Sequence, residues 1–191
     1  MRSVTIDIDT ISGKLNNVPV HLGDDIMTSS NKTNLLVKYS VLIAMTTVMT
    51  MVIRIPTIGT NGYLNLGDMV VFIAAMMLGK KGGFIVGGIG SSLADILLGY
   101  THYAPITFVV KGLEGFIAGV ILETKIGKKY PLIATVVGGV WMALGYYFAE
   151  TFMYGAKAAL AGIPGNTMQG LFGAVTAVIL FKALKRTRFN N

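Results

Sequence analysis

Four ionisable side chains lie inside long apolar stretches of the sequence, where they could bind a polar ligand or pair with one another: Asp95, Lys111, Glu114 and Glu150. A charge at membrane depth is energetically costly, so such a group usually faces the interior of a helix bundle and is either paired or functional. Lys111 and Glu114 are three residues apart and share a helix face with Thr107. Two interpretations follow. One is a structural ion network, chiefly Lys111 with Glu114 or Asp95, and the other is a substrate role for Asp95, Lys111 and Glu114.

Glu150 is set apart from this group by its aromatic neighbours. It lies near the end of its apolar stretch, with Tyr146, Tyr147 and Tyr154 on about the same helix face. We therefore consider Glu150 a candidate ligand-binding residue.

Motifs for nucleotide chemistry are absent. The glycine-rich run Gly82–Gly90 contains no G-x-x-x-x-G-K-[ST] pattern, and Gly79–Lys81 and Gly127–Lys129 lack both the upstream glycine spacing and the hydroxyl. If the protein pumps a substrate, we expect another subunit to supply the ATPase.

Signals for enzymatic chemistry are also weak. His21 and His102 have no second histidine at metal-ligand spacing, there is no cysteine, and no G-x-S-x-G occurs. We expect no catalytic residue, no metal and no cofactor. An intramembrane enzyme that uses Asp95 or Glu150 is the alternative from another functional class.

The elements that must position these residues are membrane helices. The chain is 53% hydrophobic and 13% charged, whereas a soluble domain carries about 25% charged residues. Six apolar segments follow one another, at residues 35–53, 68–79, 82–98, 104–122, 131–154 and 166–184. The second and third are shorter than the ~20 residues that a perpendicular span needs. They are either two short spans surrounded by protein or one re-entrant hairpin.

The positions of the cations predict orientation. Every second loop is basic, with Lys80 and Lys81, then Lys125, Lys128 and Lys129, and finally Lys182, Lys185, Arg186 and Arg188. The opposite loops carry only Arg54 and Lys157. This alternation predicts an all-α, integral membrane bundle of six transmembrane helices with both termini cytoplasmic. The cations lie between the apolar segments, so the membrane topology accounts for the net charge of +7, and we expect no nucleic acid as a partner.

Three regions are expected along the chain. Residues 1–33 form a polar cytoplasmic tail, in which Met27 is an alternative first residue, residues 34–185 form the six-helix membrane domain, and residues 186–191 form a basic cytoplasmic tail. Small residues four apart, such as Gly83 with Gly87 and Gly115 with Gly119, predict close helix packing inside the bundle. Ser40 and Ala44 on the first segment could instead dock a partner membrane protein.

A block of motifs resembles the S components of energy-coupling-factor (ECF) vitamin transporters: Leu64–Asp68, Leu78–Gly79, Gly82–Asp95, Gly99–Pro105 and Lys111–Gly119. The resemblance covers roughly residues 35–185. It implies a six-helix subunit of the plasma membrane that captures a small vitamin or precursor at the outer face. It also implies three partner subunits, namely a transmembrane coupling protein (T component) and two cytoplasmic ATPases.

The resemblance also implies two functional regions. The family's first helix carries an A-x-x-x-A docking motif, for which Ser40-x-x-x-Ala44 is the nearest match because Val48 follows Ala44. The first outer loop forms a lid over the substrate in this family. In this chain that loop contains Arg54, Asn61 and Tyr63, and Asp68 at its end is expected to cap the second segment.

The substrate is expected to be hydroxymethylpyrimidine or pyridoxine, with pantothenate and riboflavin as alternatives. A heteroaromatic ring would stack on aromatic side chains and hydrogen-bond to polar ones, namely Tyr103, Tyr147 and Trp141 for stacking and Asn65, Glu150, Asn166 and Gln169 for hydrogen bonds. Asp95, Thr107 and Lys111 complete the candidate substrate-binding set. The carboxylate of pantothenate would instead require Arg54 or Lys111.

Overall fold

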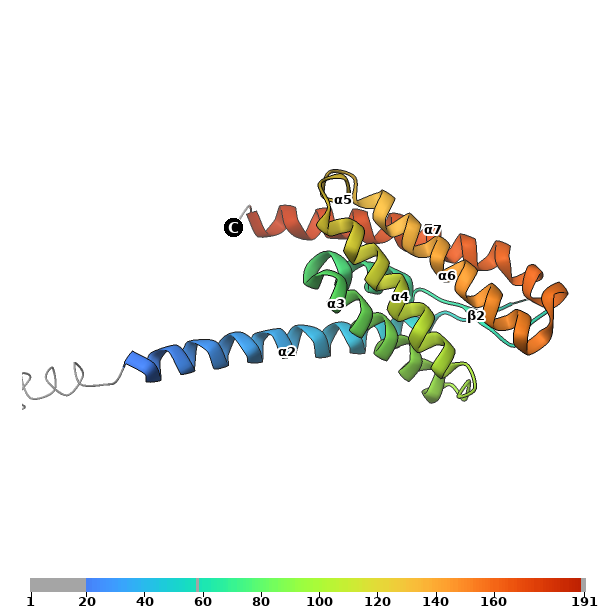
Figure 1. The fold of residues 1–191 in the computed structure, drawn as a ribbon, viewed down its shortest axis with the longest axis horizontal. Helices are drawn as coiled ribbons and strands as arrows, with labels where there is room; N and C mark the ends of the chain where they lie inside the picture. Colours follow the sequence, from blue (N-terminus) through green and yellow to red (C-terminus); the bar gives the residue numbers. More distant parts are fainter. Residues whose placement is uncertain (1–19, 58, 190–191) are drawn as a thin grey trace, which may run out of the picture. The chain divides into compact units, whose positions relative to one another are not determined.

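The protein is almost entirely helical in the part of the chain that the computed structural model describes, residues 20–57 and 59–189 (Figure 1). The helices are α2 (Val20–Val52), α3 (Gly67–Leu97), α4 (Ala104–Glu123), α5 (Lys125–Lys129), α6 (Pro131–Tyr154) and α7 (Ala156–Phe189). Two short strands, β1 (Ile55–Pro56) and β2 (Tyr63–Leu64), pair antiparallel between α2 and α3.

Five of these helices are long and apolar enough to cross a membrane: Asn31–Val52, Gly67–Leu97, Ala104–Glu123, Pro131–Tyr154 and Ala156–Arg186. The protein is therefore a helical, multi-pass membrane protein, as its hydropathy predicted. The fourth and fifth predicted segments coincide with α4 and α6, each of which has a proline in its first turn. Proline suits that position because the N–H it lacks would have no partner there.

Helix α3 is two helices joined at Gly79. Gly79 has φ 72° and ψ −168°, a backbone conformation that glycine adopts without steric cost. The two halves then fold back on each other, since a Cβ on Gly83 would lie 3.0 Å from the Cβ of Ala75 and one on Gly87 would lie 2.9 Å from Val71 Cγ1. In a straight helix Ala75 and Gly83 would be about 12 Å apart. The break at Gly79 lies where the second predicted segment ends.

Glycines let α3 and α4 approach closely. A Cβ on Gly83 would collide with the carbonyl oxygen of Gly115, and one on Gly119 would collide with the backbone of Lys80. The small-residue pairs on these helices therefore serve packing inside the bundle. The buried core beside this contact is built mainly from α3 and α7, with Val70, Phe72, Ala74, Ala75, Val86, Ala118, Ala174 and Ala177. Helix α6 packs along α7 (Figure 1).

The chain divides into two units between Lys38 and Tyr39, within α2. In the second unit one face of α2 is buried through Leu42, Thr46 and Thr50, and Thr47 Oγ1 donates to the carbonyl of Gly90 at 2.9 Å. Helix α2 begins at Val20, inside the stretch expected to be a polar tail, while residues 1–19 lie outside the described residues. The extent of the tail thus stays a prediction.

Helix α7 begins earlier than the sequence predicted. The sixth segment was expected to start at Asn166, after an outer turn over residues 161–166. The helix instead starts at Ala156 and contains Pro164 in its interior. Residues 156–161 are mostly alanine and leucine, which are strong helix formers. The turn after α6 lies at Gly155, with φ 87°.

Candidate functional site

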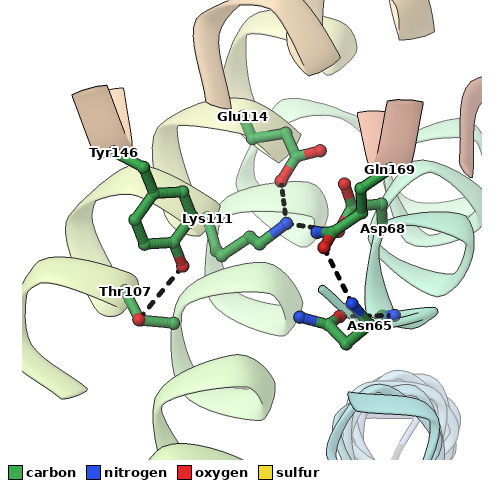
Figure 2. A network of polar contacts seen from close by, with 8 residues as sticks. Asn65, Asp68, Thr107, Lys111, Glu114, Tyr146 and Gln169 are labelled. Carbon is green, nitrogen blue, oxygen red and sulfur yellow. Dashed lines mark hydrogen bonds and ion pairs between the residues drawn. The ribbon is translucent and has the colours of Figure 1, made fainter. Parts of the chain in front are cut away.

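A buried ion network connects α3, α4 and α7 (Figure 2). Lys111 of α4 donates to Asp68 Oδ1 and lies 3.1 Å from Glu114 Oε2 on the next turn. Gln169 of α7 donates through Nε2 to the same Asp68 oxygen at 2.9 Å. The three charged side chains are at most 1% exposed. Lys111 thus holds two carboxyl groups together between three helices.

Asp68 has a different role from the one predicted. It was expected to cap the start of its helix, but the residue at the N-cap is Leu66, whose side chain makes no capping hydrogen bond. Asn65 Oδ1 instead accepts from the first backbone N–H of the helix, that of Gly67, at 2.8 Å. Asp68 lies in the first turn and turns inward to Lys111. The prediction of a Lys111–Glu114 pair is confirmed, whereas the ion pairs of Lys111 in the described residues do not include Asp95.

A narrow polar cavity, partly open to solvent, lies beside this network. Eight of the ten predicted substrate-binding residues line it, together with Tyr63 of the predicted lid: Asn65, Asp95, Tyr103, Thr107, Lys111, Glu150, Asn166 and Gln169. A concave site with a few converging polar groups is the usual form of a small-molecule site.

Two carboxylates on different helices each face a tyrosine at this cavity. Tyr63 donates to Asp95 Oδ1 at 2.6 Å, and Tyr103 donates to Glu150 Oε1 at 3.1 Å. The second oxygens, Asp95 Oδ2 and Glu150 Oε2, are buried and have no hydrogen-bond partner among the described residues. Buried polar atoms are nearly always hydrogen-bonded. These two acceptors are therefore free to accept from a ligand.

Burial keeps both tyrosines in the donor form. Burial first, and then the hydrogen bond to Asp95, raises the pKa of the Tyr63 phenol. Burial also raises the pKa of Tyr103, with a further contribution from the neighbouring Tyr154 and Glu150. A phenol in an apolar setting beside a carboxylate loses its proton less readily, because a phenolate there would be desolvated and repelled. Each tyrosine therefore orients one carboxylate by donating to it.

The β1–β2 hairpin contributes Thr57, Gly62 and Tyr63 to the cavity lining. Its register pairs Ile55 with Leu64 and Pro56 with Tyr63, which places Tyr63 next to Asp95. Gln169 Oε1 accepts from the backbone N–H of Asn65 at 2.8 Å. Gln169 therefore ties the end of the hairpin to Asp68 and the ion network. The other predicted lid residues, Arg54 and Asn61, are exposed and do not line the cavity.

Trp141 and Tyr147 lie away from the cavity, although both were expected to stack on a ring. Trp141 lines an apolar groove between α4 and α6 with Phe148, and the ring of Tyr147 lies 5.5 Å from that of Phe148. Tyr147 lies about 100° around α6 from Tyr146, and its ring packs on Phe148 and does not line the cavity.

Five further residues line the cavity that were not predicted as site residues: Thr50, Thr57, Gly62, Ser91 and Tyr146. Tyr146 hydrogen-bonds to Thr107 at 3.1 Å (Figure 2), and its spacing of four from Glu150 was a usable signal. Thr50 lies in an apolar segment and carried no signal of its own. Its hydroxyl and that of Ser91 are buried without a partner in the described part of the chain.

Comparison with known proteins decides the family. Residues 30–186 match the family described as "ECF-type riboflavin transporter, S component". The chain belongs to the S-component family of ECF transporters. It is also 37% identical over 140 residues to a protein of Pyrococcus woesei described as "Uncharacterized protein in gap 3'region", covering 73% of this chain and 94% of that protein. It is 28% identical over 160 residues to "Thiamine precursor transporter HmpT" of Lactococcus lactis subsp. cremoris (strain MG1363), covering 81% of this chain and 92% of that protein.

Membership confirms the resemblance that the motifs indicated. The protein is a transporter subunit and not an enzyme, so the alternative of intramembrane catalysis by Asp95 or Glu150 is set aside. In this family the subunit that binds substrate works with separate membrane and ATPase subunits, which agrees with the lack of a nucleotide-binding motif in the sequence.

Proposed function

We propose that the protein captures a pyridine or pyrimidine vitamin precursor, hydroxymethylpyrimidine or pyridoxine, in the cavity beneath the β1–β2 hairpin. The observation that carries this proposal is the polar cavity inside an otherwise apolar bundle, with buried acceptors at Asp95 and Glu150 that have no partner among the described residues. A small ring with several donors would supply the missing hydrogen bonds.

Two observations favour this substrate, and the family description points to another. The likeness to a thiamine precursor transporter points to the pyrimidine class. The family description points instead to riboflavin, which is the second candidate. The carboxylate of pantothenate would require Arg54 or Lys111, but Arg54 lies outside the cavity lining and Lys111 is already paired with Asp68 and Glu114.

We propose that the protein lies in the plasma membrane and crosses it six times, with both termini in the cytoplasm. The break at Gly79 supports counting the two halves of α3 separately, and Lys80 and Lys81 directly after it support a cytoplasmic turn. The cavity then opens toward the outer face, where the hairpin would act as a lid.

The proposed partners are a T component and two ATPases, and the proposed docking face lies on α2. Ser40 and Ala44 are exposed on this helix. Exposed Val41, Met45 and Val48 extend the same apolar surface. Small residues within such a surface allow another membrane helix to approach closely.

The test is thermal unfolding of the purified protein in detergent against hydroxymethylpyrimidine, pyridoxine, riboflavin, pantothenate, thiamine, folate and biotin. A ligand at a hundredfold excess over its Kd stabilises the native state by about 2.7 kcal/mol. We expect protection by hydroxymethylpyrimidine or pyridoxine, which is lost in Glu150→Ala and kept in Glu123→Ala, a matched change at an exposed site. Protection by none of the seven, with a cooperative unfolding transition, would overturn the vitamin assignment.

A further inference from the structure

The charges around the cavity are unbalanced. The buried carboxyl and amino side chains of the described residues are Asp68, Asp95, Glu114, Glu150 and Lys111, each at most 3% exposed. They comprise four carboxyl groups and a single ammonium group. Lys111 is held between Asp68 and Glu114, so its charge is already matched. In the described part of the chain no buried cation is left over to face a ligand.

Asp95 and Glu150 face the cavity in the same manner. Each has one oxygen that accepts from a tyrosine and a second, buried oxygen that has no partner among the described residues. Asp95 comes from α3 and Glu150 from α6, so the two free acceptors belong to different walls of one cavity. A bound molecule therefore meets acceptors on two sides.

We propose that Asp95 and Glu150 make the site selective for charge, so that it binds an amine-bearing or protonated heteroaromatic ring and rejects the anionic form of the same ring. This rests on the proposed function, since it assumes that the cavity is the substrate site. A ligand N–H or ammonium group makes a charge-assisted hydrogen bond to each free oxygen. A ligand carboxylate has no hydrogen to donate, so it leaves both free oxygens unpaired and is repelled by their charge.

The test compares ligands that share one ring and differ only in the charge of one substituent, which is neutral, cationic or anionic. One set is pyridoxine, pyridoxamine and 4-pyridoxate. The other set is 4-amino-2-methylpyrimidine with a hydroxymethyl, an aminomethyl or a carboxylate group at position 5. Kd is measured by isothermal titration calorimetry on the full chain in detergent. We expect the aminomethyl compounds to bind at least as tightly as the hydroxymethyl compounds and the carboxylates to bind on the order of tenfold to a hundredfold more weakly.

Two isosteric variants assign this selectivity to residues. Asp95→Asn and Glu150→Gln remove charge with little change in shape. Each should reduce the difference in Kd between the aminomethyl and the carboxylate ligands. Glu123→Gln, at an exposed ion pair with Lys80, is the matched control and should keep the wild-type ranking. A difference in Kd that stays at the wild-type value in both variants would overturn the assignment to Asp95 and Glu150.

The outcomes separate this inference from the proposed function. Carboxylate compounds that bind wild-type protein as tightly as their hydroxymethyl partners would overturn charge selectivity while the vitamin-binding function stands. Failure of all six compounds to bind the folded protein, with riboflavin or pantothenate bound instead, would overturn the favoured substrate class and this inference with it.

Discussion

Replacing Lys111 by methionine should destabilise the protein far more than replacing Glu114 by glutamine. Lys111 is 1% exposed, and among the described residues its ammonium group alone pairs with the carboxyl groups of Asp68 and Glu114. Methionine has a similar length but no charge, so Lys111→Met leaves two buried carboxyl groups without a counter-ion. Removing one partner of a buried ion pair costs about 3–5 kcal/mol. Glu114→Gln removes only the surplus carboxyl group and keeps the pair with Asp68, so its effect should stay below about 1 kcal/mol.

The free energy of unfolding is measured by titrating the protein with sodium dodecyl sulfate in mixed micelles, without ligand. By the conversion for soluble domains of this size, the loss in Lys111→Met corresponds to a fall in Tm of roughly 6–20 °C. The triple variant with Asp68→Asn and Glu114→Gln should recover a large part of that loss, because no uncompensated buried charge remains. Equal losses in Lys111→Met and Glu114→Gln, or no recovery in the triple variant, would refute the reasoning.

Three further predictions concern the lid, the helix packing and the docking face. Tyr63→Phe removes the hydrogen bond to Asp95 and should weaken ligand binding by about 1 kcal/mol, measured as Kd by calorimetry. Gly115→Ala forces a Cβ against the Gly83 backbone and should lower the free energy of unfolding by about 1–3 kcal/mol in the same micelle titration. Ala44→Trp, on the exposed face of α2, should abolish co-purification with the T component and ATPases while Kd for the vitamin stays unchanged.

Each of these has a matched control. Tyr130→Phe, at an exposed tyrosine, should leave Kd unchanged. If it raises Kd as much as Tyr63→Phe does, the effect at Tyr63 is not due to its hydrogen bond with Asp95. Gly165→Ala faces the movable side chain of Leu64, so its loss should be smaller than that of Gly115→Ala. Phe152→Trp places the same side chain at another exposed position and should keep the partners bound. A complex that survives Ala44→Trp would exclude this face of α2 as the docking surface.

Much of the fold was predictable because transmembrane helices are a local property of sequence. Hydropathy over about 20 residues marks a span, and Pro105 and Pro131 mark the first turns of α4 and α6. The same local reasoning failed at Pro164. There the chain continues as a helix through a residue that usually ends one, and contacts elsewhere in the fold decide the outcome.

The candidate site was predictable by residue type and less so by direction. Charge within apolar segments predicted Asp95, Lys111 and Glu150 as site residues, because a membrane segment tolerates such residues only where they are paired or functional. All three line the cavity. Tyr147 and Trp141 were chosen for their aromatic rings, yet both lie away from the cavity. The type of a residue does not determine whether its side chain points toward the cavity or away from it, because that depends on how the helix is rotated in the bundle.

The sequence by itself determined that this chain is a helical membrane protein, where its charges lie along the chain, and through its motifs which family it belongs to. Only the tertiary structure decided which polar groups far apart in the sequence meet. Asp68 and Lys111 are 43 residues apart, and Tyr63 and Asp95 are 32 residues apart. Helix formation depends on neighbours within a few residues, whereas these pairs depend on how α3, α4 and the hairpin pack. That packing is set by close glycine contacts and by the turn at Gly79, whose effects reach across the whole bundle.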